Sequence, residues 1–204
     1  KEEIIEAGGK YSGVYRVEYA LRINFARTFK KILGFMEDSS AQCYLRILLR
    51  RWDVQNVKTI LRGKNIHSTS EEIQECLFPA AELDEVALGE MIRQPDMKAV
   101  LDLMATLRIE YVKPLMKHLK DHSSDSGLLA FESALDRYYY EDALARVRGN
   151  SYDERLVRRM LQEEIDVVNL KSILRLARDK TGLEDVKGIL IDGGAVMHMD
   201  DIDR

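Results

Sequence analysis

The sequence has few cysteines, few prolines and no long apolar run, and each shortage argues against a class of protein. Two cysteines, Cys43 and Cys76, are too few for a disulfide framework, so we expect reduced cytosolic thiols that pack as small core side chains. Three prolines in 204 residues, with few clusters of β-branched residues, leave little room for an all-β fold. No stretch approaches the ~18 apolar residues that span a bilayer, because three arginines interrupt the segment 44–52.

Familiar catalytic motifs are missing as well. The sequence contains no glycine-rich phosphate loop, no Gly-x-Ser-x-Gly and no His-Glu-x-x-His. His118 and His122 could hold a metal, and Glu132 and Asp136 could do acid–base work, because each pair is spaced i, i+4 on a helix. An exposed polar helix end and a packed, charged helix are the simpler interpretations. We therefore expect no catalytic residue, no cofactor and no metal.

One feature that is present is a duplication. Residues 53–62 read DVQNVKTILR and residues 166–175 read DVVNLKSILR, with seven of ten positions identical. The offset is 166 − 53 = 113 residues, and the same offset pairs Arg46 with Arg159 and Leu77 with Leu190. Such self-similarity predicts structural units that exist to pack on their neighbours, which favours a scaffold over a single-site enzyme.

Apolar residues at helical spacing, with N-cap residues and glycine stops, predict helix after helix. The expected helices cover 14–33, 38–63, a short segment after Thr69, 84–93, 97–122 with a break near Pro114, 128–147, and a segment that starts at Ser151. We expect an all-α fold of two tandem repeats of a multi-helix unit, residues 1–122 and 123–204, separated by the polar stretch SSDSG. The second unit stops where the first continues, so we expect a sequence cut at its C-terminus.

The duplicated motif supplies the candidate site residues. They are Arg46, Asp53, Asn56, Lys58 and Arg62 in the first copy, and Arg159, Asp166, Asn169, Lys171 and Arg175 in the second. Asn and Asp each cost ~0.5 kcal/mol against Ala inside a helix, so their recurrence indicates a task. Two interpretations stay open. In the first, which the repetition favours, they satisfy backbone groups of the following loops and Arg pairs with Asp; in the second, they line a surface for a partner.

Charge and methionine patterns leave two further alternatives. Basic residues crowd the first copy, as in some nucleic-acid-binding helices, but acidic residues nearly balance the second copy and the net charge is −4. We therefore expect a solvated or salt-bridged face and no nucleic acid. The methionines of successive helices read as core filling, or as an adaptable surface for a partner helix; they are Met91, Met97, Met104 and Met116.

Several of these segments resemble one protein family. The segments are Glu132 with 134–139 (ALDRYY), 166–171 (DVVNLK), 173–175 (ILR), Gly193-Gly194, 53–58 (DVQNVK) and 60–64 (ILRGK). The chain resembles the C subunit of archaeal and bacterial A/V-type ATP synthases, whose eukaryotic counterpart is the d subunit of the vacuolar proton ATPase. It departs from the family pattern at Ala80-Ala81, where a glycine-bearing turn is usual. Family members are longer and hold three related helical units, so the resemblance implies a fragment that lacks parts of both ends.

The resemblance implies a non-catalytic part of a rotary machine. Such subunits form a funnel of three helical units on the cytoplasmic face of the membrane proteolipid ring, and the shaft subunits D and F enter the socket. The implied role is a central-stalk connector that couples ATP chemistry to proton or sodium transport, peripheral to the membrane and without a transmembrane segment of its own. The alternative from the residues is a helical-repeat adaptor that binds partner helices and has no rotary role.

Overall fold

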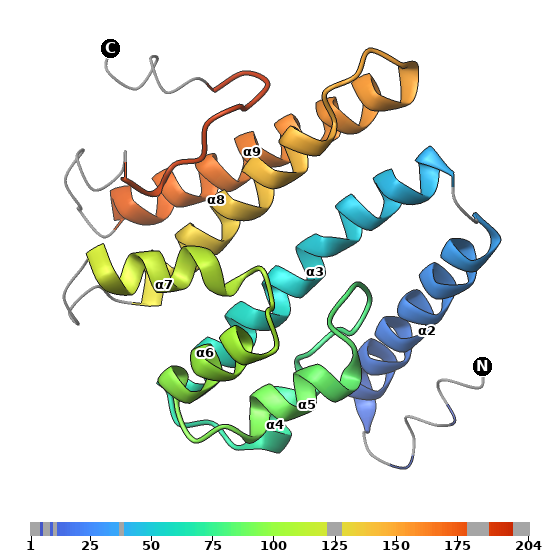
Figure 1. The fold of residues 1–204 in the computed structure, drawn as a ribbon. Helices are drawn as coiled ribbons and strands as arrows, with labels where there is room; N and C mark the ends of the chain where they lie inside the picture. The colour runs from blue at the N-terminus through green and yellow to red at the C-terminus, as the bar shows by residue number, and fades with distance from the viewer. Residues whose placement is uncertain are drawn as a thin grey trace. The chain divides into compact units, whose positions relative to one another are not determined.

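The fold is built from helices throughout the part of the chain that the structure describes. The structure, a computed structural model, describes residues 5, 9, 12–36, 39–121, 128–178 and 188–197, and for residues 118–121 the backbone alone. None of these residues lies in a β-strand, so the expected all-α class is confirmed (Figure 1).

Two compact units divide the chain, Lys1–Leu107 and Arg108–Arg204. Helices α2 (Gly13–Phe35), α3 (Ser40–Asn65), α4 (Ser70–Glu75), α5 (Glu85–Arg93) and α6 (Met97–Thr106) belong to the first unit. Helices α7 (Val112–Asp121), α8 (Leu128–Arg146) and α9 (Tyr152–Arg178) belong to the second. The division falls before the expected boundary at 122/123, because α7 packs against α8. A repeat boundary at 122/123 stays a prediction, since a compact unit and a sequence repeat need not end at the same residue.

In the first unit, α2 and α3 form an antiparallel hairpin, and α3 also contacts α4, α5 and α6 (Figure 1). An aromatic cluster joins the hairpin to the loop after α4. The ring centroids of Phe25 and Trp52 are 6.0 Å apart, and the Phe78 ring lies 5.3 Å from Phe25 and 4.6 Å from Trp52. Tilted and edge contacts of this kind stabilise a packed cluster beyond the area they bury.

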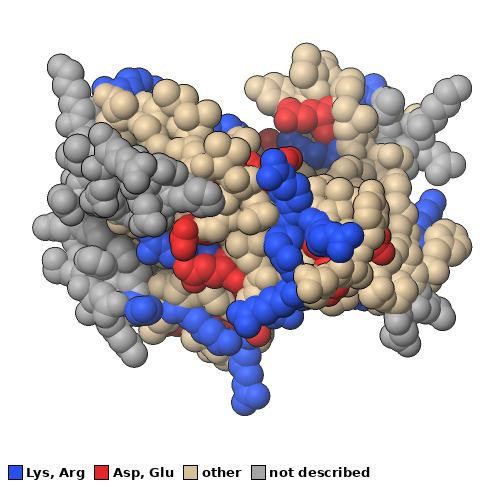
Figure 2. Space-filling model, turned by 90° about the horizontal axis from the view of Figure 1, so that it is seen from above, with Lys and Arg blue, Asp and Glu red and all other residues tan. Residues whose placement is uncertain are grey.

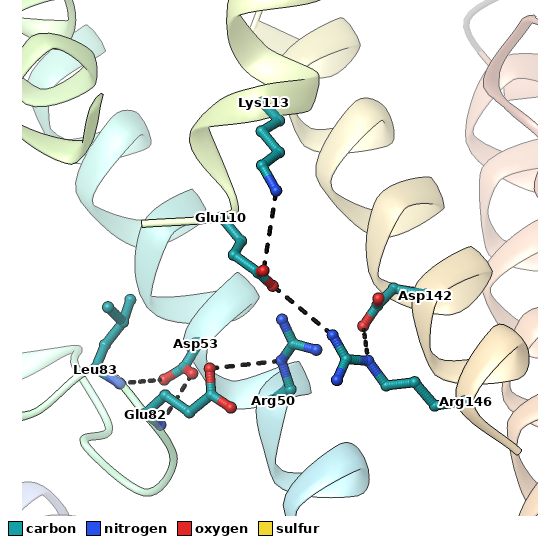
Figure 3. Close-up of polar contacts among 8 residues, drawn as sticks. All are labelled: Arg50, Asp53, Glu82, Leu83, Glu110, Lys113, Asp142 and Arg146. Atoms are coloured by element: carbon teal, nitrogen blue, oxygen red, sulfur yellow. Dashed lines mark hydrogen bonds and ion pairs between the residues drawn. The ribbon is translucent and has the colours of Figure 1, made fainter. Parts of the chain in front are cut away.

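The second unit is a second antiparallel hairpin, α8 with α9, and α7 lies against α8 (Figure 1). Tyr111 meets Tyr138 edge-on with centroids 6.3 Å apart. Arg146 pairs with Asp142 at 2.7 Å and with Glu110 at 3.8 Å, which ties the start of α7 to α8 (Figure 3). These pairs are partly exposed, so they contribute little to stability and mainly fix geometry.

Most helices begin where short polar side chains predicted that they would. A side-chain oxygen accepts a hydrogen bond from the backbone N–H three residues ahead, which satisfies one of the free amides of a first helical turn. The capping residues are Ser39, Thr69, Asp84, Asp96 and Ser151.

The break expected near Pro114 is present, and the burial expected for the two cysteines is wrong. The helix expected over 97–122 is interrupted at residues 107–111, where Arg108 has φ 56°, and Pro114 lies just after the break, in the first turn of α7. A proline is tolerated there because first-turn amides have no intrahelical acceptor. Both cysteines, expected in the core, are exposed free thiols.

Candidate functional site

Each copy of the duplicated motif holds a loop through one buried asparagine. Asn56 of α3 donates through Nδ2 to the carbonyl oxygen of Phe78 at 2.8 Å, and its Oδ1 accepts from the Phe78 N–H at 2.7 Å. Asn169 of α9 donates to the carbonyl of Ile191 at 2.8 Å and accepts from its N–H at 2.9 Å. One primary amide therefore satisfies both backbone groups of a loop residue, which a buried loop requires.

The aspartates of the motif hold the same loops a few residues further on. Asp53 accepts from the N–H groups of Glu82 at 3.0 Å and Leu83 at 3.1 Å (Figure 3). Asp166 accepts from the N–H groups of residues 195, 196 and 197 at 3.1, 2.9 and 3.0 Å. Hydrogen bonds to an ionised carboxylate are stronger than neutral ones, so these two groups anchor the loops firmly. We call residues 75–83 the first anchored loop and residues 188–197 the second.

The anchoring repeats at the period of the sequence. The residue held by Asn169 follows the residue held by Asn56 by 191 − 78 = 113 positions. For the aspartates, 195 − 82 = 113 and 196 − 83 = 113. The motif and its loop therefore recur together: the asparagine contacts use the same atoms in both units, and Asp166 accepts one further bond, from Met197. These contacts match the interpretation in which Asn and Asp satisfy loop backbone, and burial of Asn56 and Asn169 closes both amides to a partner.

An arginine on the preceding helix reaches each anchored loop, and sequence reasoning missed this role. Arg22 of α2 donates to the Glu75 carbonyl at 2.8 Å, and Arg137 of α8 donates to the Gly188 carbonyl at 2.5 Å. These acceptors are again 188 − 75 = 113 positions apart, whereas the donors differ by 137 − 22 = 115. The donors are out of register by two residues, so a search at a fixed offset does not pair them.

The two loops differ at the residues that follow the asparagine contact. The second loop has Gly193 with φ 95° and Gly194, where an added Cβ would lie 2.1 Å from Asp166 Oδ1. The first loop has Ala80 and Ala81 at the equivalent positions, so it reaches its aspartate by another path. Glycine is needed in the second loop both for the left-handed backbone and for the close approach to the carboxylate.

The basic residues of the motif do not gather into one site. Lys58 and the nearby Arg50 are buried, and Arg50 pairs with Glu82 at 3.6 Å (Figure 3). The other basic candidates are exposed: Arg46, Arg62, Arg159, Lys171 and Arg175. Of these, Arg159 pairs with Glu163 at 2.6 Å. On the face drawn in Figure 2, basic side chains lie beside acidic and uncharged ones.

The structure describes only some of the chemical candidates from the sequence. Glu132 is buried and Asp136 half-buried on α8. The side chain of His118 and all of His122 lie outside the described residues. Within the described part of the chain, no cluster of three or more His, Cys, Asp or Glu side chains could hold a metal ion, and no helix has the length and hydropathy of a membrane span.

A pocket of about 620 Å³ lies in the first unit beside the first anchored loop. Its lining includes the aromatic side chains Phe25, Trp52 and Phe78. Its one carboxylate, from Glu18, is 3.6 Å from Arg22, so the lining presents an ion pair and an apolar wall. This composition suits packing against an apolar group better than acid–base chemistry.

The family model described as ATP synthase (C/AC39) subunit matches residues 1–204. The chain belongs to the ATP synthase (C/AC39) subunit family. Two similar members are both named as the C subunit of an A-type ATP synthase. The protein of Methanosarcina acetivorans is 32% identical over 199 residues, which cover 95% of this chain and 52% of the relative. The protein of Halorubrum lacusprofundi is 32% identical over 192 residues, covering 94% and 54%.

Membership of the C/AC39 family confirms the resemblance read from the duplicated motif. The chain spans about half the length of the curated relatives it matches; for the Methanosphaera stadtmanae protein, 29% identical over 187 residues, the covered share is 47%. Both anchored loops lie within the matched region, residues 1–204.

Proposed function

We propose that this chain is part of a non-catalytic central-stalk connector of an A-type ATP synthase. The observation that carries the proposal is membership of the C/AC39 family over the whole chain, together with relatives named as the C subunit of A-type ATP synthases. The connector joins the shaft subunits D and F to the membrane proteolipid ring. It lies on the cytoplasmic side as a peripheral subunit and takes part in ATP-linked proton or sodium transport.

The construction of the chain supports a mechanical role. A part that transmits torque must keep its shape, and a loop bonded to both helices of a hairpin holds one helix against the other. Each hairpin here binds its anchored loop through three side chains. One asparagine and one aspartate come from the second helix of the hairpin, and one arginine comes from the first. These bonds are buried or charge-assisted, so local opening of the loop is costly.

Under this proposal the duplicated residues are structural. Asp53, Asn56, Asp166 and Asn169 are occupied by loop backbone, which leaves other surfaces of the subunit for D, F and the ring. The connector would then have its contacts with other subunits on surfaces that the motif holds in position, and none on the motif itself.

Depletion and re-addition of the full-length subunit test the proposal. Membranes that contain the synthase but lack this subunit should hydrolyse ATP without moving ions, and purified full-length subunit should restore ATP-driven ion transport. The same preparation should co-elute with the D–F shaft in size-exclusion chromatography. Unchanged coupling in depleted membranes, with no co-elution, would overturn the connector role.

The adaptor role remains the second candidate, because tandem helical units also build peptide-binding scaffolds. Affinity purification of the tagged full-length protein from membranes separates the two roles. A connector follows the synthase subunits through purification in constant proportion. An adaptor is recovered with other proteins and without the synthase.

A further inference from the structure

One face of α9 is exposed where the equivalent face of α3 is buried. Met160, Val167, Leu170 and Leu174, here called the α9 stripe, are 44%, 50%, 50% and 63% exposed. The residues 113 positions earlier form the α3 stripe, and they are 3%, 1%, 0% and 0% exposed: Ile47, Val54, Val57 and Leu61. Both stripes are apolar and follow the i, i+3/i+4 spacing of one helix face. Equivalent helices with the same pattern therefore have different surroundings.

We attribute the covering of the α3 stripe to the helices that follow α3 and pack against it. Helix α3 contacts α4, α5 and α6, and it meets α2 through another face that carries Trp52. Helices α5 and α6 are amphipathic, and their buried residues are Leu88, Met91, Ile92, Val100, Leu101 and Met104. In the first unit the chain thus runs from α3 through the first anchored loop into a helix pair that packs back on α3.

The second unit sets up the same path. Asn169 and Asp166 hold the second anchored loop through residues at the same offset as in the first, so the second loop lies against α9 as the first lies against α3. In the first unit, α5 begins at Glu85, two residues after the last held amide, at Leu83. The relatives are about twice as long as this chain.

We propose that the α9 stripe is the docking surface for two amphipathic helices equivalent to α5 and α6, carried by the same polypeptide C-terminal to the second anchored loop. Their apolar faces cover Met160, Val167, Leu170 and Leu174 as α5 and α6 cover the α3 stripe. The occupant is part of the subunit's own fold, so a shaft or ring subunit binds elsewhere. This inference does not depend on the connector role.

The charge on the stripe is compatible with such a cover. Glu163 lies between Met160 and Val167, and it pairs with Arg159 at 2.6 Å. Arg50 holds the equivalent place on α3, where it is buried and pairs with Glu82. A charge at this position can be covered when its partner is covered with it, because a buried ion needs a hydrogen-bonded counter-charge.

Leu156 provides a matched control on the same helix. It is 49% exposed, and its counterpart 113 positions earlier is Cys43, which is also exposed. The proposal therefore predicts a boundary: the cover extends over Leu170 and stops short of Leu156.

Cysteine labelling of the full-length subunit tests this boundary. In a background with Cys43→Ser, Cys76→Ser and any further cysteine replaced, Leu170→Cys should react with a maleimide at least about tenfold more slowly than Leu156→Cys, because packed sites react only on local opening. Carbene footprinting of the unmodified subunit gives the same comparison without substitutions. It should modify the α9 stripe much less than Leu156.

Equal labelling of Leu170→Cys and Leu156→Cys in the isolated full-length subunit would overturn the proposal. Protection that develops only after addition of D, F or the ring would assign the stripe to a partner. Protection that increases with protein concentration would assign it to a second copy. Each of these results contradicts a cover from the same polypeptide, and none bears on whether ATP hydrolysis is coupled to transport.

Discussion

At the scale of single residues, the duplicated asparagines show why a polar residue persists in the middle of a helix. Each amide has one donor end and one acceptor end aimed at the N–H and C=O of the same loop residue. An aspartate could not donate to the carbonyl, and a leucine could do neither, so asparagine is the residue that fits both groups. The helix-propensity cost is offset by two buried hydrogen bonds.

Replacing Asn56 or Asn169 with leucine should destabilise the protein. Each change leaves a buried N–H and a buried C=O without their partner, and we expect a loss of ~1–3 kcal/mol in the free energy of unfolding. Chemical denaturation of each full-length variant measures the loss. Gln55→Leu, at an exposed neighbouring position of α3, is the control and should change stability by less than ~0.5 kcal/mol. Unchanged stability in both Asn variants would mean that the loops do not need these bonds.

Gly194→Ala should also be destabilising, for a steric reason. The added Cβ would lie 2.1 Å from Asp166 Oδ1, which forces the carboxylate away from the three amides it binds. We expect a loss of ~1–3 kcal/mol by thermal or chemical unfolding. Gly188→Ala, where an added Cβ meets nothing within 4 Å, is the matched control. If both variants unfold alike, the second loop has room that the structure does not show.

At the scale of helices, the sequence predicted starts better than stops. Ser39 and Thr69 cap α3 and α4 as expected, because an N-cap acts within three residues and is visible in the sequence. The stop expected at Gly63 is wrong, because α3 continues to Asn65. Gly63 instead lies against Ile73, where an added Cβ would come within 2.4 Å of the side chain. Close approach to another helix depends on tertiary packing, which the local sequence pattern does not show.

The candidate site is also only partly predictable from the sequence. The repetition identified Asp53, Asn56 and their counterparts, because identical residues at a fixed offset are visible without a structure. The loop residues that they hold are 22 to 31 positions away and use backbone atoms, which carry no sequence signal. Lys58 is buried and Lys171 is exposed at the same motif position, so even a repeated residue can have two environments.

Helix α4 offers a test of local capping. It has six residues, and Thr69 and Glu72 form a reciprocal capping box at its start. A helix this short is not stable alone, so Thr69→Ala should cost ~1 kcal/mol and increase hydrogen exchange in residues 71–75. Ser68→Ala, one residue before the cap, serves as the control. Equal exchange in the two variants would show that packing alone maintains α4.

Across the chain, the two compact units contain the same arrangement, repeated at the period seen in the sequence. Each has a hairpin, an anchored loop and an arginine from the first helix of the hairpin to the loop. Both partners of every one of these bonds lie in the same unit. Repeat proteins built this way distribute stability among units, and each unit can respond to a change with some independence.

This independence leads to a prediction about how far the effect of a substitution extends along the chain. In the full-length subunit, Asn169→Leu should speed backbone hydrogen exchange along α9 by roughly 5–30-fold, the factor for a loss of one to two kcal/mol, and leave α3 unchanged. Asn56→Leu should do the reverse, because Phe78 and Ile191 each belong to the unit of their own asparagine. Hydrogen-exchange mass spectrometry of the two variants supplies the comparison, and each is the control for the other. If either variant accelerates exchange equally in both helices, the units open together and the stability of one hairpin depends on the anchored loop of the other.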